Sequence, residues 1–198
     1  MLGTLVQGVP NQDGQYSGNG WEWLGLFPLY CGAVLVVGYT WLGACWLYWR
    51  TVEDLQHRSG RQAKALAIVT MILLAVLVIW TATLDAQYVH RFSNRLVWLP
   101  AAILLAALLI SFTLSFRSRR QYLPLFAALG IFIFAFALMI AALFPLIVPP
   151  NLTLQEAASS PTSQFFMLVG FAVLIPVTLL YNTYGFRVFS GKVRAIRD

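Results

Sequence analysis

Residues Ala65–Leu84 read ALAIVTMILLAVLVIWTATL, twenty consecutive positions without a charged side chain. An α-helix rises about 1.5 Å per residue, so this stretch spans about 30 Å, the thickness of the hydrocarbon core of a bilayer. Polar and apolar residues do not alternate along it, as they would in a strand of a membrane β-barrel. The stretch therefore predicts a transmembrane helix.

Four other uncharged stretches of the chain are longer still, and each predicts a membrane-spanning helix for the same reason. We therefore expect an all-α integral membrane protein, with five transmembrane helices forming a helical bundle with one helix at its edge, in a single membrane domain over residues 1–198. The five predicted spans are Leu24–Trp49, Ala65–Leu84, Leu96–Phe116, Tyr122–Val148 and Phe165–Phe186.

The composition agrees with a membrane location. Hydrophobic residues make up 60% of the 198 positions and charged residues 10%, with a mean hydropathy of +0.75, whereas soluble proteins carry about 25% charged residues. This composition excludes a soluble enzyme, a secreted disulfide scaffold and a disordered tail. The net charge of +6 would favour a nucleic-acid partner in a soluble protein, so the positions of the charges have to be considered.

The thirteen basic residues are distributed unevenly between the two sides of the predicted membrane. Eleven fall on one side, in the first loop, the third loop and the tail, and two fall on the other side, in the second loop. Cytoplasmic loops carry an excess of Lys and Arg, so we expect the N-terminus outside and the C-terminus in the cytoplasm. The basic charge reflects topology, and no nucleic-acid partner is implied. The eleven are Arg50, Arg58, Arg61, Lys64, Arg117, Arg119, Arg120, Arg187, Lys192, Arg194 and Arg197.

Residues that could carry chemistry are scarce within the predicted spans. Both histidines, His57 and His90, lie in loops, so we expect no haem in this chain. Cys31 and Cys45 are fourteen positions apart on one predicted helix, about 21 Å along its axis, which is too far for a disulfide. The spans contain no charged residue of the kind that a proton relay uses. The sequence therefore predicts no catalytic, cofactor-binding or metal-binding residue.

Small residues in the first span favour close helix packing. Gly32 and Gly43 are eleven positions apart, three turns of a helix, and Gly38 and Ala44 flank them. These contacts could lie within the chain or with a partner, and we favour contacts within the chain. Pro176 falls near the middle of the last span and predicts a kink there, because proline lacks the N–H that would bond to the carbonyl four residues earlier.

An ordered set of local patterns covers essentially the whole chain, and this set resembles the C-terminal half of subunit II of cytochrome bd quinol oxidases. The matching segments are Gly3–Pro10, Leu29–Gly32, Leu42–Ala44 with Arg50-Thr51, Leu143–Pro145 with Pro149-Pro150, Leu152–Ser160, Tyr181–Thr183 and Val188–Val193.

The resemblance implies a haem-free structural subunit of a terminal oxidase that oxidises quinol and reduces O₂ to water in aerobic respiration. In that family haems b and d belong to the partner, subunit I, which agrees with the loop positions of both histidines here. The implied location is the bacterial cytoplasmic (inner) membrane, and the implied partners are subunit I, the missing N-terminal half of subunit II, membrane lipids and quinol.

The chain departs from the family pattern in two respects. The family often shows Lys-Thr-x-Gly where this chain reads Arg50-Thr51-Val52-Glu53. Family members are also about twice as long, so we expect either a subunit encoded in two pieces or a truncated reading frame, and we favour truncation or a fragment. The alternatives from other classes are a small membrane permease, and an assembly or anchor subunit of another respiratory complex.

Overall fold

The computed structural model is built almost entirely from helices, which confirms the predicted all-α class. It describes residues 2–8, 11–12, 15–84, 95–118, 120–144, 146–148 and 152–188. The helices are α1 (Leu2–Gln7), the 3₁₀ turn η1 (Glu22–Leu24), α2 (Leu26–Arg50), α3 (Glu53–Leu84), α5 (Arg95–Ser115), α6 (Leu123–Leu143) and α7 (Pro161–Val188). Four short strands, β1 (Asn11–Gln12), β2 (Gln15–Tyr16), β3 (Leu146–Val148) and β4 (Leu152–Thr153), form two antiparallel pairs.

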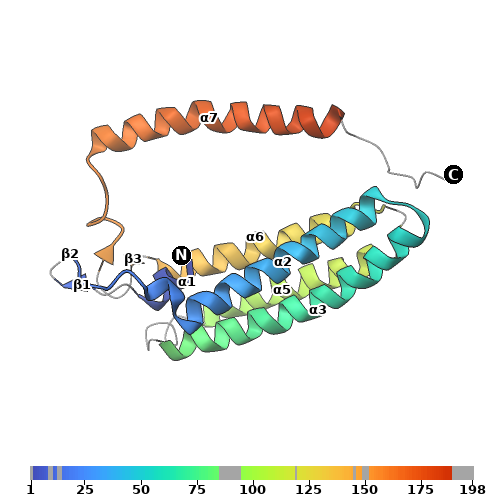
Figure 1. Ribbon diagram of the computed structural model, residues 1–198, viewed down its shortest axis with the longest axis horizontal. Coiled ribbons are helices and arrows are strands. Elements are labelled where there is room, and N and C mark those ends of the chain that lie inside the picture. The colour runs from blue at the N-terminus through green and yellow to red at the C-terminus, as the bar shows by residue number, and fades with distance from the viewer. Residues whose placement is uncertain are drawn as a thin grey trace.

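Helices α2, α3, α5 and α6 lie side by side as a four-helix bundle, and α7 runs beside it (Figure 1). By length and hydropathy, α2, α3, α6 and α7 can each cross a membrane, while the apolar segment Leu99–Ser115 of α5 is shorter. The chain is therefore a multi-pass membrane protein. The bundle has two distinct ends. We call the end with α1 and the short strands the hairpin end, and the end with the α2–α3 and α5–α6 turns the arginine end.

All five helices differ in extent from the uncharged stretches that predict them, and α3 and α6 differ most at a single end. Helix α3 begins at Glu53, twelve residues before the uncharged stretch, because a helix can continue into the polar interface. Helix α6 ends at Leu143, whereas the stretch runs to Val148. Phe144 is extended, with ψ of 136°, and a residue before a proline avoids the α region. The chain then pairs Leu146–Val148 with β4.

The turn between α2 and α3 is short and well bonded. The amide and the hydroxyl of Thr51 both donate to the carbonyl of Leu47, at 3.0 and 2.7 Å. The Gln56 side-chain amide donates to the Tyr48 carbonyl at 3.0 Å. These bonds satisfy carbonyls at the end of α2 that have no partner within the helix. Glu53 closes the turn with φ of +56°, a left-handed conformation that glycine adopts most easily.

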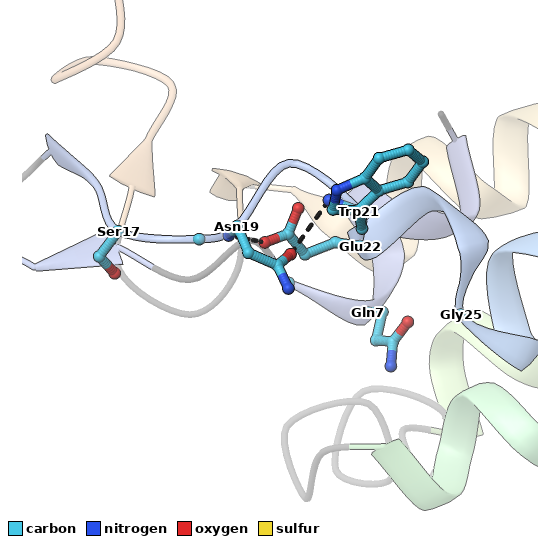
Figure 2. Close-up of a pocket in the computed structure, with 8 residues that line it drawn as sticks. Gln7, Ser17, Asn19, Trp21, Glu22 and Gly25 are labelled. Carbon is cyan, nitrogen blue, oxygen red and sulfur yellow. Dashed lines mark hydrogen bonds between the residues drawn. The ribbon is translucent and has the colours of Figure 1, made fainter.

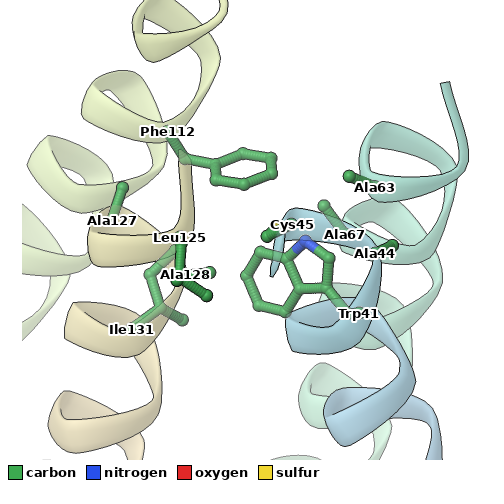
Figure 3. Packing of buried hydrophobic residues seen from close by; sticks show 10 residues of the cluster. All are labelled: Trp41, Ala44, Cys45, Ala63, Ala67, Phe112, Leu125, Ala127, Ala128 and Ile131. Carbon is green, nitrogen blue, oxygen red and sulfur yellow. The ribbon is translucent and has the colours of Figure 1, made fainter. Parts of the chain in front are cut away.

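The core of the bundle is centred on Trp41, which is fully buried (Figure 3). Its ring meets Phe112 of α5 edge to face, with centroids 5.1 Å apart. The ring also lies 6.2 Å from the ring of Phe132 of α6, so Trp41 extends from α2 toward α5 and α6. The other buried members of the cluster are Ala44, Cys45, Ala63, Ala67, Leu125, Ala127, Ala128 and Ile131.

Polar and aromatic contacts also set the register of α2 against α3. The Tyr30 hydroxyl donates to the carbonyl of Leu73 at 2.9 Å, and Trp80 meets the ring of Phe27 at 5.5 Å. Near the opposite end, the ring of Tyr48 lies against Gly60. The two helices therefore run antiparallel over the full length of α2.

Helix α7 is exposed along its length. Every residue from Pro161 to Val188 is exposed except Gly185, which is half-buried. The ring of Phe186 in α7 contacts the ring of Trp46 in α2 near the arginine end, with centroids 5.7 Å apart. The predicted helix at the edge of the bundle is thus α7.

Candidate functional site

An open pocket of about 630 Å³ lies at the hairpin end, where α1, η1 and the start of α2 meet (Figure 2). The loop before α2 forms one wall and the end of α1 the other. The lining residues are Gln7, Gly8, Ser17, Gly18, Asn19, Trp21, Glu22 and Gly25.

Two hydrogen bonds shape the loop that forms this wall. The backbone N–H of Asn19 donates to Glu22 Oε1 at 2.8 Å, and the N–H of Trp21 donates to Asn19 Oδ1 at 3.0 Å. Both bonds hold the chain at the start of η1, as capping side chains do. The lining offers amide, hydroxyl and carboxylate groups that can bind a polar molecule. Among these lining residues Glu22 is the one acid and no histidine or cysteine occurs, so they supply no acid–base pair.

The described residues also contain no group of three or more His, Cys, Asp or Glu side chains that could hold a metal ion. His57 is exposed on α3, and His90 lies outside the described residues. Cys31 and Cys45 are free thiols, the first half-buried and the second buried.

The four packing candidates on α2 are divided between two faces. Gly38 and Ala44 are buried in the bundle, and a Cβ at Gly38 would lie 2.5 Å from Phe132 Cζ of α6. Gly32 and Gly43 face outward, and a Cβ at either would meet no described atom within 4 Å. The eleven-residue spacing places Gly32 and Gly43 on one face of the helix, but the sequence could not show that this face is exposed while Gly38 and Ala44 are buried.

Pro176 lies within α7, which continues as one helix from Pro161 to Val188. The helix is not interrupted at Pro176, and this residue is exposed. The kink at Pro176 stays a prediction.

Side chains in the segment before α7 form hydrogen bonds at the start of that helix. Ser160 precedes the first helical residue, and its hydroxyl oxygen accepts the N–H of Ser163 at 3.5 Å. The Gln164 side chain donates to the Ser159 carbonyl at 2.8 Å. The first is an N-capping bond, and the second satisfies a carbonyl just before the helix begins.

A second capped turn precedes this segment, and it carries a carboxylate with an altered pKa. The N–H and the hydroxyl of Thr153 donate to Glu156 Oε2 at 3.0 and 2.8 Å, and the N–H of Glu156 donates back to Thr153 Oγ1 at 3.3 Å. The backbone bond first, and then the hydroxyl bond, lower the pKa of Glu156 below its ordinary value. The carboxylate is fully exposed, so this is a local turn and not a buried site.

At the arginine end, cationic side chains lie over aromatic rings. The Lys64 ammonium is 4.7 Å from the centre of the Phe116 ring, and the Arg50 guanidinium is 5.6 Å from the Trp46 ring. The pairs join residues up to 52 positions apart, so the sequence alone did not indicate them. Half-buried aromatic rings beside basic groups at the end of a transmembrane bundle are typical of the headgroup region.

Comparison with known proteins identifies the relatives of this chain. The sequence profile of a family described as cytochrome bd terminal oxidase subunit II matches residues 1–189. A probable cytochrome oxidase subunit 2 from Haemophilus influenzae is 25% identical, over 98% of this chain and 61% of its own length. The cytochrome bd-I ubiquinol oxidase subunit 2 of Escherichia coli K12 is also 25% identical, over 97% of this chain and 60% of its own length. The chain therefore spans about three fifths of these relatives.

Proposed function

Because the chain belongs to the cytochrome bd terminal oxidase subunit II family, we propose that it is a haem-free structural part of an oxidase that oxidises quinol and reduces O₂ to water. The observation that carries the proposal is the profile match over residues 1–189, nearly the whole chain. The name of the Escherichia coli relative, a ubiquinol oxidase subunit, supports quinol as the substrate of the complex.

The residues of the chain support a structural role within that complex. The described residues contain no group of three or more potential metal ligands, and the hydroxyl of Ser160 serves as a helix cap. Electron transfer from quinol to O₂ needs redox groups, which we assign to a partner, the haem-bearing subunit I with haems b and d. The chain would then contribute the four-helix bundle and α7 to the shared membrane domain.

Helix α7 is the surface that we assign to the partner. It is apolar, long enough to cross the membrane, and exposed on all sides. Helices pack in membranes through small residues that allow close approach, and Gly170 of α7 has no described atom within 4 Å of a Cβ built on it. Since the relatives are longer than this chain, the remainder of subunit II is a second candidate partner of α7.

We place the chain in the bacterial inner membrane, with the hairpin end outside and the arginine end in the cytoplasm. The support is the positive-inside rule, since the loops at the arginine end carry most of the basic residues. The pocket at the hairpin end would then face the outer surface.

Purification from native membranes tests the proposal. An affinity-tagged chain should co-purify with a haem-bearing subunit, giving the absorbance bands of b- and d-type haems and quinol-dependent O₂ consumption. A colourless, homogeneous preparation would contradict it. Solute flux in liposomes that contain this chain alone would support the permease alternative, and co-purification with a different respiratory complex would support the anchor alternative.

A matched pair of variants tests the role of α7 in the same preparation. Leu180→Gln places a polar group on exposed α7, and Ile79→Gln places one at a comparably exposed position of α3. If α7 carries the partner, L180Q should lower the amount of co-purified haem and I79Q should not. Equal amounts of co-purified haem in both variants would show that α7 does not carry the partner contact.

A further inference from the structure

We propose that the arginine end of the bundle binds the phosphate headgroup of an anionic phospholipid, between the first turns of α3 and the α5–α6 turn. The proposal requires a bilayer around the bundle and does not depend on oxidase function. It rests on the depth of the basic residues in the membrane, on their positive charge and on the aromatic rings that surround them.

The depth of the basic residues matches the headgroup region. Lys64 is the last charged residue before the uncharged stretch that begins at Ala65, so it lies at the boundary of the hydrocarbon core. The preceding turns of α3, from Glu53, extend about 18 Å beyond that boundary at 1.5 Å per residue. Their inner face is buried against the bundle through Ser59 and Gly60. The headgroup layer is about 5–8 Å deep on each side, so the last turn before that boundary, which carries Arg61 and Lys64, lies at the level of lipid headgroups.

This outer face joins a second basic segment. Lys64 and Arg61 are exposed and lie on one face of α3, three positions apart. Lys64 extends over the Phe116 ring at 4.7 Å, and Phe116 immediately precedes the exposed Arg117 of the α5–α6 turn. The two segments are therefore adjacent in space. The described basic residues of these two segments and of the end of α2 are Arg50, Arg58, Arg61, Lys64, Arg117 and Arg120. The same segments contain two acidic residues, Glu53 and Asp54.

The rings around these charges favour a membrane lipid over a soluble anion. Trp46 and Trp49 meet edge to face with centroids 5.3 Å apart, and Trp49 meets Tyr122 at 6.5 Å. Such rings occupy the interface between headgroups and acyl chains. A phosphate held by Arg61 and Lys64 would therefore have its acyl chains beside apolar surface, for example the exposed Ile68 one turn further along α3.

Native mass spectrometry of the full chain tests the proposal. The chain is transferred from nanodiscs that contain equal amounts of phosphatidylglycerol and phosphatidylcholine, and the bound lipids are counted. The wild type should retain phosphatidylglycerol in preference. Each basic residue near a membrane surface contributes enough attraction to change lipid affinity about fivefold. The affinity of K64Q for phosphatidylglycerol should therefore fall about fivefold, and that of R61Q/K64Q should fall further. K64R should retain the lipid.

The matched control removes one positive charge at the other end of the molecule. Arg95 begins α5, at the opposite end of that helix from Ser115, and R95Q should retain phosphatidylglycerol as the wild type does. Equal retention by K64Q and the wild type, or equal retention of both lipids by the wild type, would overturn the proposal. Loss of the bound lipid to excess inorganic phosphate would identify a site for soluble anions instead. Circular dichroism in phosphatidylcholine verifies that each variant is folded. If the double variant unfolds, the comparison of K64Q with K64R still decides the outcome.

Discussion

Glu53 occupies a left-handed conformation, with φ of +56°, at the turn between α2 and α3. A residue with a Cβ pays about 1 kcal/mol in this region, which glycine does not. Glu53→Gly should therefore raise the free energy of unfolding by about 1 kcal/mol, which a denaturant titration in detergent micelles measures. Glycine is also the residue that the family pattern often has at this position.

The neighbouring residue supplies the control for this prediction. Asp54 lies in the first turn of α3, where an acidic side chain favours the helix and glycine weakens it. Asp54→Gly should lower the free energy of unfolding. A loss of stability in E53G as large as that in D54G would show that the left-handed conformation is not the cause.

Gly38 marks the closest approach of α2 to α6. A Cβ there would lie 2.5 Å from Phe132 Cζ, so Gly38→Ala must displace the ring and should cost about 1 kcal/mol. Gly43→Ala, on the same helix, meets no described atom within 4 Å and should leave stability unchanged or slightly raised. Thermal unfolding in one detergent compares the two. Phe132→Leu should relieve G38A, and its failure to do so would contradict the assigned clash.

Glu156 should titrate below the ordinary range of a glutamate, because Thr153 bonds to its ionised form. The pKa is lower in the folded turn than in the unfolded chain, so the bonds stabilise the turn above the unfolded pKa, about 4.3. That contribution is lost as the pH falls through the folded pKa. A ¹³C NMR titration of the carboxylate should show the low midpoint, and Thr153→Val should raise it part of the way, since the backbone bond remains. Thr162→Val, in the first turn of α7, should leave it unchanged.

At the scale of helices, the four-helix bundle and α7 should respond differently to the same substitution. Ile131 of α6 is 1% exposed and Ile175 of α7 is 54% exposed. Ile131→Ala leaves a cavity and should lower the free energy of unfolding of the chain by about 2 kcal/mol. Ile175→Ala removes the same atoms and should change it little. Comparable losses in both variants, measured by denaturant titration in micelles, would show that α7 packs on the bundle in solution.

The uncharged stretches predicted the existence and the class of these helices, but not all of their ends. The uncharged stretch begins just after Lys64, yet α3 begins earlier, at Glu53, because backbone hydrogen bonds form whatever the charge of the side chain. Val148 ends the fourth stretch, yet α6 ends at Leu143, since strand pairing competes with the helix beyond that point. The faces of Gly38 and Gly43 could be separated only once neighbouring helices were placed.

Across the whole molecule, the proposed orientation predicts which loops are accessible from outside the cell. In a background with Cys31→Ser and Cys45→Ala, Ser159→Cys should react with a membrane-impermeant maleimide in intact cells. Ser118→Cys, in the turn at the arginine end, should react only after the membrane is permeabilised. The reverse pattern would mean that the positive-inside rule assigns this chain wrongly.

The open pocket and the basic end show why the sites were harder to predict than the fold. The pocket combines Gln7 of α1 with Glu22 and Gly25 near α2, and the cation over Phe116 comes from Lys64. No periodic pattern connects such positions, because loops and turns bring them together. Membrane spans, by contrast, depend on length and hydropathy, which are local properties of the sequence.

The separation of α7 from the bundle also has a consequence for biogenesis. The bundle helices are all encoded before Phe144, and α7 begins at Pro161. The ribosome therefore delivers the whole bundle to the translocon before the helix with the most exposed surface has been synthesised. We therefore expect the bundle to pack before α7 captures its partner.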